Sequence, residues 1–172
     1  MDSLLSQART MPALLATACL AALGIALAAQ HWGGLQPCVL CIYQRYAYGA
    51  ALAAAVVGVV IAGSLLGRRL ALIASGLAFG AGSAIAMFHV GVEQKWWKGT
   101  DACHAPSFPE GATPQEQLAI MLNQPFVACD VIPWELFGIS MAGFNVLASL
   151  VLAALSFWAA FKFGSPHKKG LR

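Results

Sequence analysis

The segment 37–45 reads Pro-Cys-Val-Leu-Cys-Ile-Tyr-Gln-Arg, and it places two cysteines in C-x-x-C spacing with an arginine four residues after the second. Two sulfurs at this spacing can close a small disulfide ring or ionise, and a thiolate at a helix N-terminus is stabilised by the free N–H groups there. If a helix begins near Cys38, Cys41 and Arg45 lie on the same face, and Arg45 lies beneath the second sulfur. An arginine beside an apolar run is a functional candidate. The alternative is a structural disulfide beside an arginine that reaches the membrane surface.

The elements that hold these residues are predicted to be membrane-spanning helices. Of the 172 residues 59% are hydrophobic and 10% are charged, with mean hydropathy +0.72, which is too apolar for a soluble domain of this size. A spanning helix needs about 20 apolar residues, and we predict a single all-α domain, a four-transmembrane-helix bundle, with spans near 12–30, 42–66, 70–92 and 136–161. The first span could instead be a cleaved signal peptide, but its apolar run is longer than the usual signal core. The formal charge of +3 is not concentrated in a basic patch, so nucleic-acid binding is not predicted.

The long loop 93–135 is too long for a passive connector, and it carries six of the seven acidic residues. Thr113 and Glu116 have the spacing of a capping box, with Pro114 at the first helical position, which predicts a short helix. This helix is expected to be amphipathic and to lie on the membrane surface, or else to pack on the rest of the loop. Its expected apolar face consists of Leu118, Met121 and Leu122.

The distribution of lysine and arginine predicts the orientation of the bundle. Loops that face the cytoplasm carry an excess of basic residues, so both termini are expected in the cytoplasm and the loop 93–135 in the periplasm. The side assigned to the cytoplasm collects Arg9, Arg68, Arg69, Lys162, Lys168, Lys169 and Arg172, whereas the other collects Lys95 and Lys98, with Arg45 set aside as intramembrane. The outer interface would then carry an aromatic belt of Trp32, Trp96, Trp97 and Trp134.

Four of the five cysteines fall on the outer side, which is oxidising in a bacterium, so disulfides are expected there. Four cysteines permit three pairings, of which Cys38–Cys41 with Cys103–Cys129 is the local one. Zinc sites usually combine two close pairs, and because Cys103 and Cys129 are 26 residues apart no metal site is predicted. Purely structural disulfides remain possible. A haem-binding electron carrier remains a weaker alternative, with His31 and His89 as its candidate ligands. The fifth cysteine, Cys19, is expected to be a small buried hydrophobe.

Together with the four apolar runs and the two loop cysteines, the segment 37–45 resembles the DsbB family of bacterial inner-membrane proteins. Residues 134–141, Trp-Glu-Leu-Phe-Gly-Ile-Ser-Met, are similar to the family's entry into its fourth helix. The resemblance covers essentially the whole chain. It departs at Gln44, where an acid is frequent, and at Ala142, where a proline is common.

The resemblance implies a membrane enzyme that reoxidises a periplasmic DsbA-like thiol oxidase and passes the electrons to the membrane quinone pool, with ubiquinone or menaquinone as cofactor. By the same resemblance, Cys103 forms the mixed disulfide with the partner and Cys129 then attacks Cys38. Cys41 is released as a thiolate that faces the quinone ring. The cofactor contacts implied are Arg45 and His89.

Overall fold

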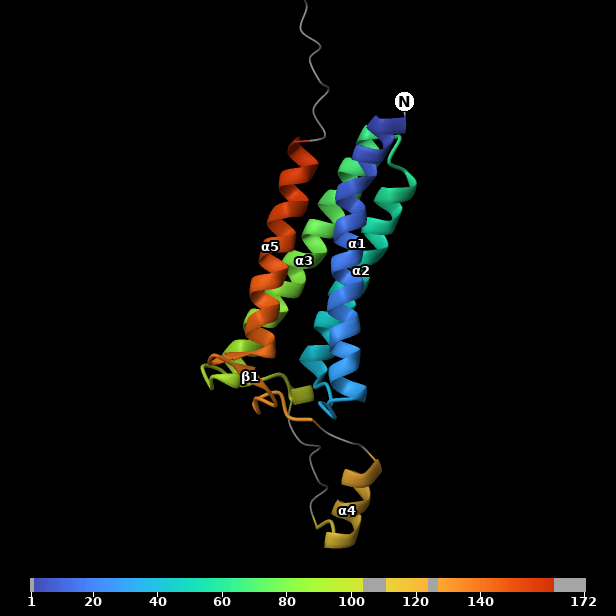
Figure 1. The fold of residues 1–172 in the computed structure, drawn as a ribbon. Coiled ribbons are helices and arrows are strands. Elements are labelled where there is room, and N and C mark those ends of the chain that lie inside the picture. Colours follow the sequence, from blue (N-terminus) through green and yellow to red (C-terminus); the bar gives the residue numbers. More distant parts are fainter. Residues whose placement is uncertain (1, 104–110, 124–126, 163–172) are drawn as a thin grey trace, which may run out of the picture.

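The computed structural model describes residues 2–103, 111–123 and 127–162, and four long helices that lie side by side account for most of them (Figure 1). These are α1 (Asp2–His31), α2 (Val39–Val60), α3 (Leu65–Glu93) and α5 (Met141–Lys162). Three of the described helices are long and apolar enough to cross a membrane, at Ala8–His31, Leu65–Glu93 and Met141–Lys162. The chain is therefore an all-α membrane protein, and α2, whose first half carries Gln44 and Arg45, lies beside these three helices.

The predicted second span, 42–66, is shifted toward the C-terminus relative to α2, which begins and ends earlier. Ser64 accepts a hydrogen bond of 3.2 Å from the backbone N–H of Gly67 and so caps the start of α3. The predicted spans 42–66 and 70–92 would leave Arg68 in the connection between two helices, and the structure contradicts this. Arg68 lies within α3, and its guanidinium donates a hydrogen bond of 3.2 Å to the carbonyl of Ala62.

The predicted fourth span, 136–161, begins too early. Residues Glu135–Leu136 (β1) and Ile139–Ser140 (β2) pair as a short antiparallel hairpin, and α5 follows directly. Phe137 and Gly138 form the turn with φ of 53° and 75°. Both central residues of a type I′ turn need positive φ, so the two-residue turn rather than a helix occupies this segment.

Small side chains allow the helices to approach each other closely. A Cβ added at Gly76 of α3 would lie 3.0 Å from the ring of Phe157 on α5, so this glycine provides the space for the ring. Tyr48 of α2 meets Phe79 of α3 edge to face, with ring centroids 5.6 Å apart. Cys19 is fully buried in the same core, which confirms the expectation that it is a buried hydrophobe.

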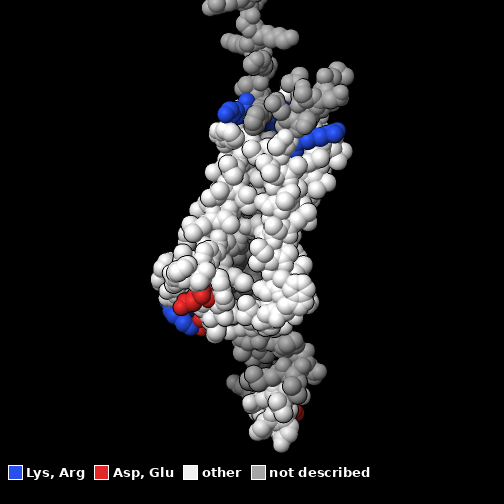
Figure 2. Space-filling view, viewed as in Figure 1, with Lys and Arg blue, Asp and Glu red and all other residues white. Residues whose placement is uncertain are grey.

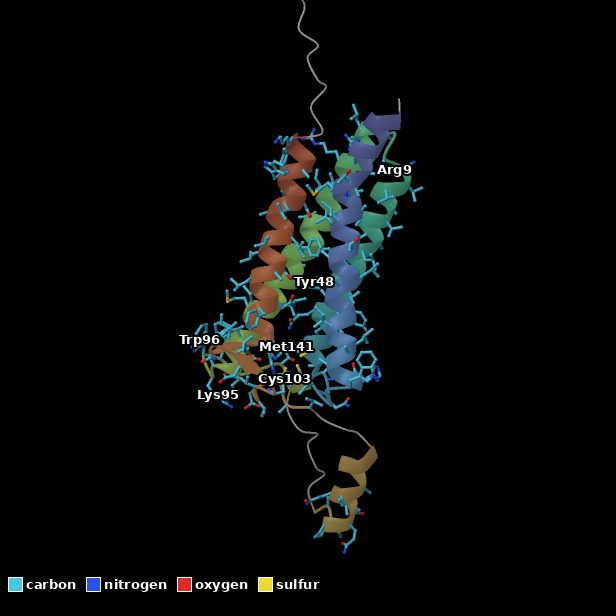
Figure 3. All side chains as sticks on the ribbon, viewed as in Figure 1. Arg9, Tyr48, Lys95, Trp96, Cys103 and Met141 are labelled. Atoms are coloured by element: carbon cyan, nitrogen blue, oxygen red, sulfur yellow. The ribbon has the colours of Figure 1, made fainter. Side chains whose placement is uncertain are left out.

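The two ends of the bundle differ in charge. Figure 2 shows lysine and arginine at the end that holds the N-terminus, and both acidic and basic side chains toward the opposite end. Figure 3 labels Arg9 at the first end and Lys95, Trp96 and Cys103 near the second. Residues 163–172, which include Lys168, Lys169 and Arg172, lie outside the described residues. All four predicted belt residues, Trp32, Trp96, Trp97 and Trp134, are exposed.

The short loop helix exists as α4 (Pro114–Asn123), and Figure 1 shows it apart from the bundle. The predicted capping box is confirmed: the backbone N–H of Thr113 donates to Glu116 Oε2 at 2.8 Å, and the N–H of Glu116 donates to Thr113 Oγ1 at 3.3 Å. The donors of Thr113 lower the pKa of Glu116. Leu118 is exposed, while the side chains of Met121 and Leu122 lie outside the described residues.

Candidate active site

The two cysteines of the C-x-x-C segment lie at the start of α2. Cys38 is the N-cap, and its sulfur accepts the backbone N–H of Cys41 at 3.4 Å. The two sulfurs are 3.1 Å apart, at which distance the thiols form a hydrogen bond. This bond to Cys41 is the largest influence on the pKa of Cys38, which it lowers, and His89 lowers it further while burial opposes both. The hydrogen bonds with Cys41 and His89 therefore favour the thiolate of Cys38, whereas the spacing alone had suggested Cys41.

The four cysteines other than Cys19 come together. Cys103 and Cys129 are buried in one cluster with Cys38, Leu40 and Val92, which we call the cysteine cluster, and Cys41 packs against it. The short 3₁₀ helix η1 (Asp101–Cys103) presents Cys103 to this cluster. Burial raises the pKa of Cys129, which is fully enclosed. Cysteines far apart in the sequence are thus packed together in one buried cluster.

Cys103 is close to α3 because Gly99 has no side chain. A Cβ at Gly99 would lie 2.7 Å from Cys103 Cβ, 3.1 Å from its sulfur and 3.4 Å from Val92 Cγ1. Real Cβ atoms essentially never approach a non-bonded heavy atom as closely as the first of these distances. Gly99 therefore provides the room in which Cys103 sits.

The loop is also attached to the end of α3 beside Cys129. Lys95 Nζ lies 2.5 Å from Asp130 Oδ2, and both side chains are largely exposed. Such an exposed pair contributes about 0–1 kcal/mol. Lys95 itself has a positive φ of 61°, and its N–H bonds to the carbonyl of Val92 while that of Trp96 bonds to Gly91, which is the Schellman pattern at a helix C-terminus.

Arg45 hydrogen-bonds to the neighbouring helix α1. Its Nη1 donates to Gln30 Oε1 at 2.6 Å and its Nη2 to the carbonyl of Ala26 at 3.3 Å, so both hydrogen bonds described for the guanidinium go to α1. That Arg45 lies beneath the Cys41 sulfur stays a prediction, and both residues line one cavity.

His89 lies at the centre of the site. It is 4% exposed, and its Nε2 lies 3.6 Å from the Cys38 sulfur and 3.8 Å from Glu93 Oε1. Its Nδ1 lies 3.1 Å from Gln44 Nε2. Glu93 is buried as well, and its Oε2 accepts a hydrogen bond of 2.5 Å from the hydroxyl of Ser140. By contrast His31, at the end of α1, is exposed.

Sequence reasoning missed Glu93 as a site residue, because it was assigned to the polar loop. The available signal was its spacing of four residues from His89, which puts both on one face of α3 if the helix continues to Glu93. It also treated Gln44 only as a departure from a pattern, although its amide contacts the histidine.

A cavity of about 260 Å³ opens beside these groups between α1, α2, α3 and α5. Most of its wall is apolar, and its polar lining comes mainly from Cys41, Gln44, Arg45, His89 and Glu93 together with Asn145. Figure 2 shows the recess in this face of the bundle, and Figure 3 labels Tyr48 and Met141, which also line it. Such an apolar cavity with few convergent polar groups suits a largely hydrophobic ring compound.

The ligand atoms of Cys38, Cys41 and His89 lie within 4.8 Å of one another, which is close enough for a metal ion. A histidine that binds a metal through Nε2 normally donates its Nδ1–H to an acceptor. Here an amide nitrogen, which can only donate, faces Nδ1. The surroundings of His89 therefore do not suit metal binding.

Comparisons with known proteins agree with one another. The family model described as disulfide bond formation protein DsbB matches residues 8–159. Three relatives are each named disulfide bond formation protein B. That of Mannheimia succiniciproducens is 31% identical over 168 residues, or 96% of this chain and 94% of that protein. That of Shewanella loihica is 36% identical over 131 residues, or 76% of each. The relative from Shewanella amazonensis is 32% identical over 164 residues, which cover 94% of this chain and 95% of that protein. No solved structure gives a significant match.

Proposed function

This chain belongs to the DsbB family and is a membrane disulfide oxidoreductase, and from that premise we propose that it reoxidises a periplasmic DsbA-like thiol oxidase and passes the electrons to quinone. The haem-carrier and structural-disulfide alternatives are not favoured, since the relatives are disulfide bond formation proteins. The observation that carries the proposal is the cysteine cluster, because it brings the loop cysteines to the C-x-x-C pair beside a mostly apolar cavity.

The proposed exchange begins when a thiolate of the partner attacks Cys103 and breaks a Cys103–Cys129 disulfide, which releases Cys129. Cys129 then attacks Cys38 and breaks the Cys38–Cys41 disulfide. The partner's second thiolate displaces Cys103 and completes the partner's disulfide, and Cys103 in turn displaces Cys38 from Cys129. The net result is an oxidised partner, a restored loop disulfide and a reduced Cys38–Cys41 pair.

The cavity fits a quinone ring in its chemistry. Its apolar wall would hold the ring, while the guanidinium of Arg45 and the imidazole of His89 could hydrogen-bond the ring oxygens. A bound quinone, ubiquinone or menaquinone, would supply a two-electron, two-proton acceptor that returns the Cys38–Cys41 dithiol to the disulfide. The chain's own part is to bind the ring beside Cys41 and to hold the thiols in place.

We also propose that all four long helices cross the bacterial inner membrane, with both termini in the cytoplasm and the cysteine pairs in the periplasm. The connections from α1 to α2 and from α2 to α3 are short. If α1 and α3 span the bilayer, α2 must cross it as well to join their opposite ends. The charge difference between the two ends supports the orientation.

The test is anaerobic mixing of the purified protein with a reduced thioredoxin-like oxidase and quinone, followed by quinol absorbance. Cys38→Ser should abolish quinol formation. Cys19→Ala is the matched control and should retain it, because Cys19 lies in the core of the bundle away from the cysteine cluster. Quinol formation by Cys38→Ser at the wild-type rate would overturn the proposed exchange.

A further inference from the structure

The side chain of Gln30, in the last turn of α1, holds the guanidinium of Arg45. Arg45 Nη1 donates to Gln30 Oε1 at 2.6 Å, and Nη2 donates to the carbonyl of Ala26 at 3.3 Å. A guanidinium has no acceptor, so the atom of Gln30 that faces it must be the amide oxygen and not the amide nitrogen. The two acceptors lie four residues apart on α1, and together they hold both Nη atoms of the planar fork.

Arg45 still has donors for a ligand in the cavity. A guanidinium carries five N–H donors, and the two described hydrogen bonds use one on each Nη, which leaves three. Arg45 lines the cavity, whereas Gln30 is not among the described residues that line it. Gln30 therefore acts on a ligand in the cavity through Arg45, by setting the direction in which the unused donors of the fork point.

The anchor of Arg45 is electrically neutral. An amide oxygen and a backbone carbonyl hold the guanidinium without cancelling its charge. Among the side chains that the structure describes, no carboxylate forms an ion pair with Arg45. Glu93, an acid that lines the cavity, instead accepts a hydrogen bond from Ser140 and lies 3.8 Å from His89. The wall of a mostly apolar cavity thus carries a positive charge that no described carboxylate offsets.

We propose that Gln30 is a positioning residue, which orients the guanidinium of Arg45 and, because it is neutral, leaves that charge available to a ring oxygen in the cavity. The orientation of Arg45 is independent of any quinone chemistry, whereas its consequence for turnover rests on the proposed function. In that reaction the Cys38–Cys41 dithiol gives up two electrons and two protons and becomes a disulfide, and quinone becomes quinol. A cation already fixed in place stabilises negative charge that builds up on the ring oxygen.

The carbonyl of Ala26 does not replace Gln30 in this role. Its hydrogen bond, at 3.3 Å, is longer than the usual N–H···O range of about 2.7–3.2 Å, whereas the bond to Gln30 is short. With Ala26 as its one acceptor on α1, the guanidinium can turn about the remaining bond. We therefore expect loss of the Gln30 amide to loosen Arg45 without releasing it from α1.

Two substitutions at Gln30 separate the orientation of Arg45 from its charge. Gln30→Leu removes the acceptor, so the apparent quinone KM should rise by about three- to tenfold. Gln30→Glu keeps an acceptor in place but adds a negative charge, and the resulting ion pair offsets the charge that faces the cavity. We expect Gln30→Glu to keep the fork oriented and to lower kcat by about tenfold.

A readout that needs no quinone is ¹⁵N NMR of the quinone-free protein with labelled arginine, in which the Arg45 signals are assigned by their loss in Arg45→Met. Hydrogen bonds at both Nη atoms slow rotation of the fork and give separate signals, whereas a loosely held fork gives an averaged signal. We expect separate signals in the wild type and in Gln30→Glu, and averaging in Gln30→Leu. His31→Leu is the matched control, because His31 is the next residue of α1 and is exposed. It should match the wild type in its spectrum and its kinetics.

The Gln30 substitutions are also made in the Arg45→Met background. Because Gln30 is proposed to act through the guanidinium, neither substitution should change KM or kcat there. A substitution that only perturbed the packing of α1 would have the same effect with and without Arg45.

The proposal is overturned if Gln30→Leu leaves both the arginine spectrum and the quinone KM as in the wild type, or if its effect persists in Arg45→Met. A wild-type kcat in Gln30→Glu would also overturn it, since the neutrality of the anchor would then have no consequence. If the wild type forms no quinol while the Arg45 signals behave as expected, the proposed function is wrong and the positioning of Arg45 by Gln30 stands.

Discussion

Replacing Gly99 with alanine is expected to push Cys103 out of the cysteine cluster. The new Cβ would lie 2.7 Å from Cys103 Cβ, whereas ordinary van der Waals contact begins near 3.4 Å. The difference is about 0.7 Å, and it must be met by movement of η1 away from α3, because Val92 blocks the other side at 3.4 Å. Overpacking of this kind costs about 1–3 kcal/mol.

Part of this cost is offset, because Gly→Ala reduces the freedom of the unfolded chain by about 0.4–1 kcal/mol. We therefore expect a net loss of about 1–2 kcal/mol in the free energy of unfolding. Cys103 should also react faster with maleimide in the reduced protein, because it leaves a site where it is 3% exposed. Quinol formation should slow, because Cys103 would no longer pack in the cysteine cluster with Cys129.

The assays are thermal unfolding in detergent, the rate of Cys103 labelling and the rate of quinol formation. Gly80→Ala is the matched control: it lies in α3 with nothing within 4 Å of its added Cβ. That variant should gain about 0.5–1 kcal/mol from helix propensity and keep wild-type labelling. Equal stability and equal labelling of Gly99→Ala and wild type would show that Gly99 does not make room for Cys103.

Three further predictions concern the site and its orientation. Arg45→Met should raise the apparent quinone KM, and Arg45→Lys should raise it less because it keeps the charge but loses the planar fork of donors, as a quinone titration of both variants will show. Since hydrogen bonds lower the pKa of Cys38, its thiolate persists to lower pH than that of an ordinary thiol. The rate at which iodoacetamide alkylates reduced Cys38 should therefore fall only at a pH below the pKa of an ordinary thiol. A pH midpoint of alkylation at or above that ordinary pKa would contradict this. An impermeant maleimide on intact spheroplasts should label Cys103 and Cys129 after reduction, whereas labelling only after lysis would reverse the orientation.

Local features of the fold could be read from the sequence. The capping box at Thr113 and Glu116 was predictable because both partners lie within one turn and their types define the bonds. The start of α5 was not, because Phe137 adopts a positive φ that its type rarely takes. A hydrophobic residue before a glycine did not signal a turn, so the apolar run was extended into the hairpin.

The site was predictable in its cysteines but not in its polar contacts. Spacing singled out Cys38 and Cys41, since their chemistry depends on neighbours along the chain. The bond between Gln44 and Asn145 joins residues 101 positions apart, and only the packing of α2 on α5 brings them together. Arg45 illustrates the same limit: its hydrogen bond to Gln30 depends on the packing of α1 against α2, which spacing along α2 does not reveal.

The position of the cavity has a consequence for enzyme kinetics. Its wall includes Ile25 of α1 and Phe144 of α5, apolar side chains that are 68% and 36% exposed on the outside of the bundle. In a membrane such a rim borders lipid tails, so a hydrophobic ligand would arrive by lateral diffusion within the bilayer. The concentration that governs binding is then the mole fraction of ligand in lipid or detergent, and its amount per millilitre of buffer is irrelevant. Adding empty micelles at constant total ligand would slow a subsaturated reaction by surface dilution, and rate constants from different preparations become comparable only on that two-dimensional scale.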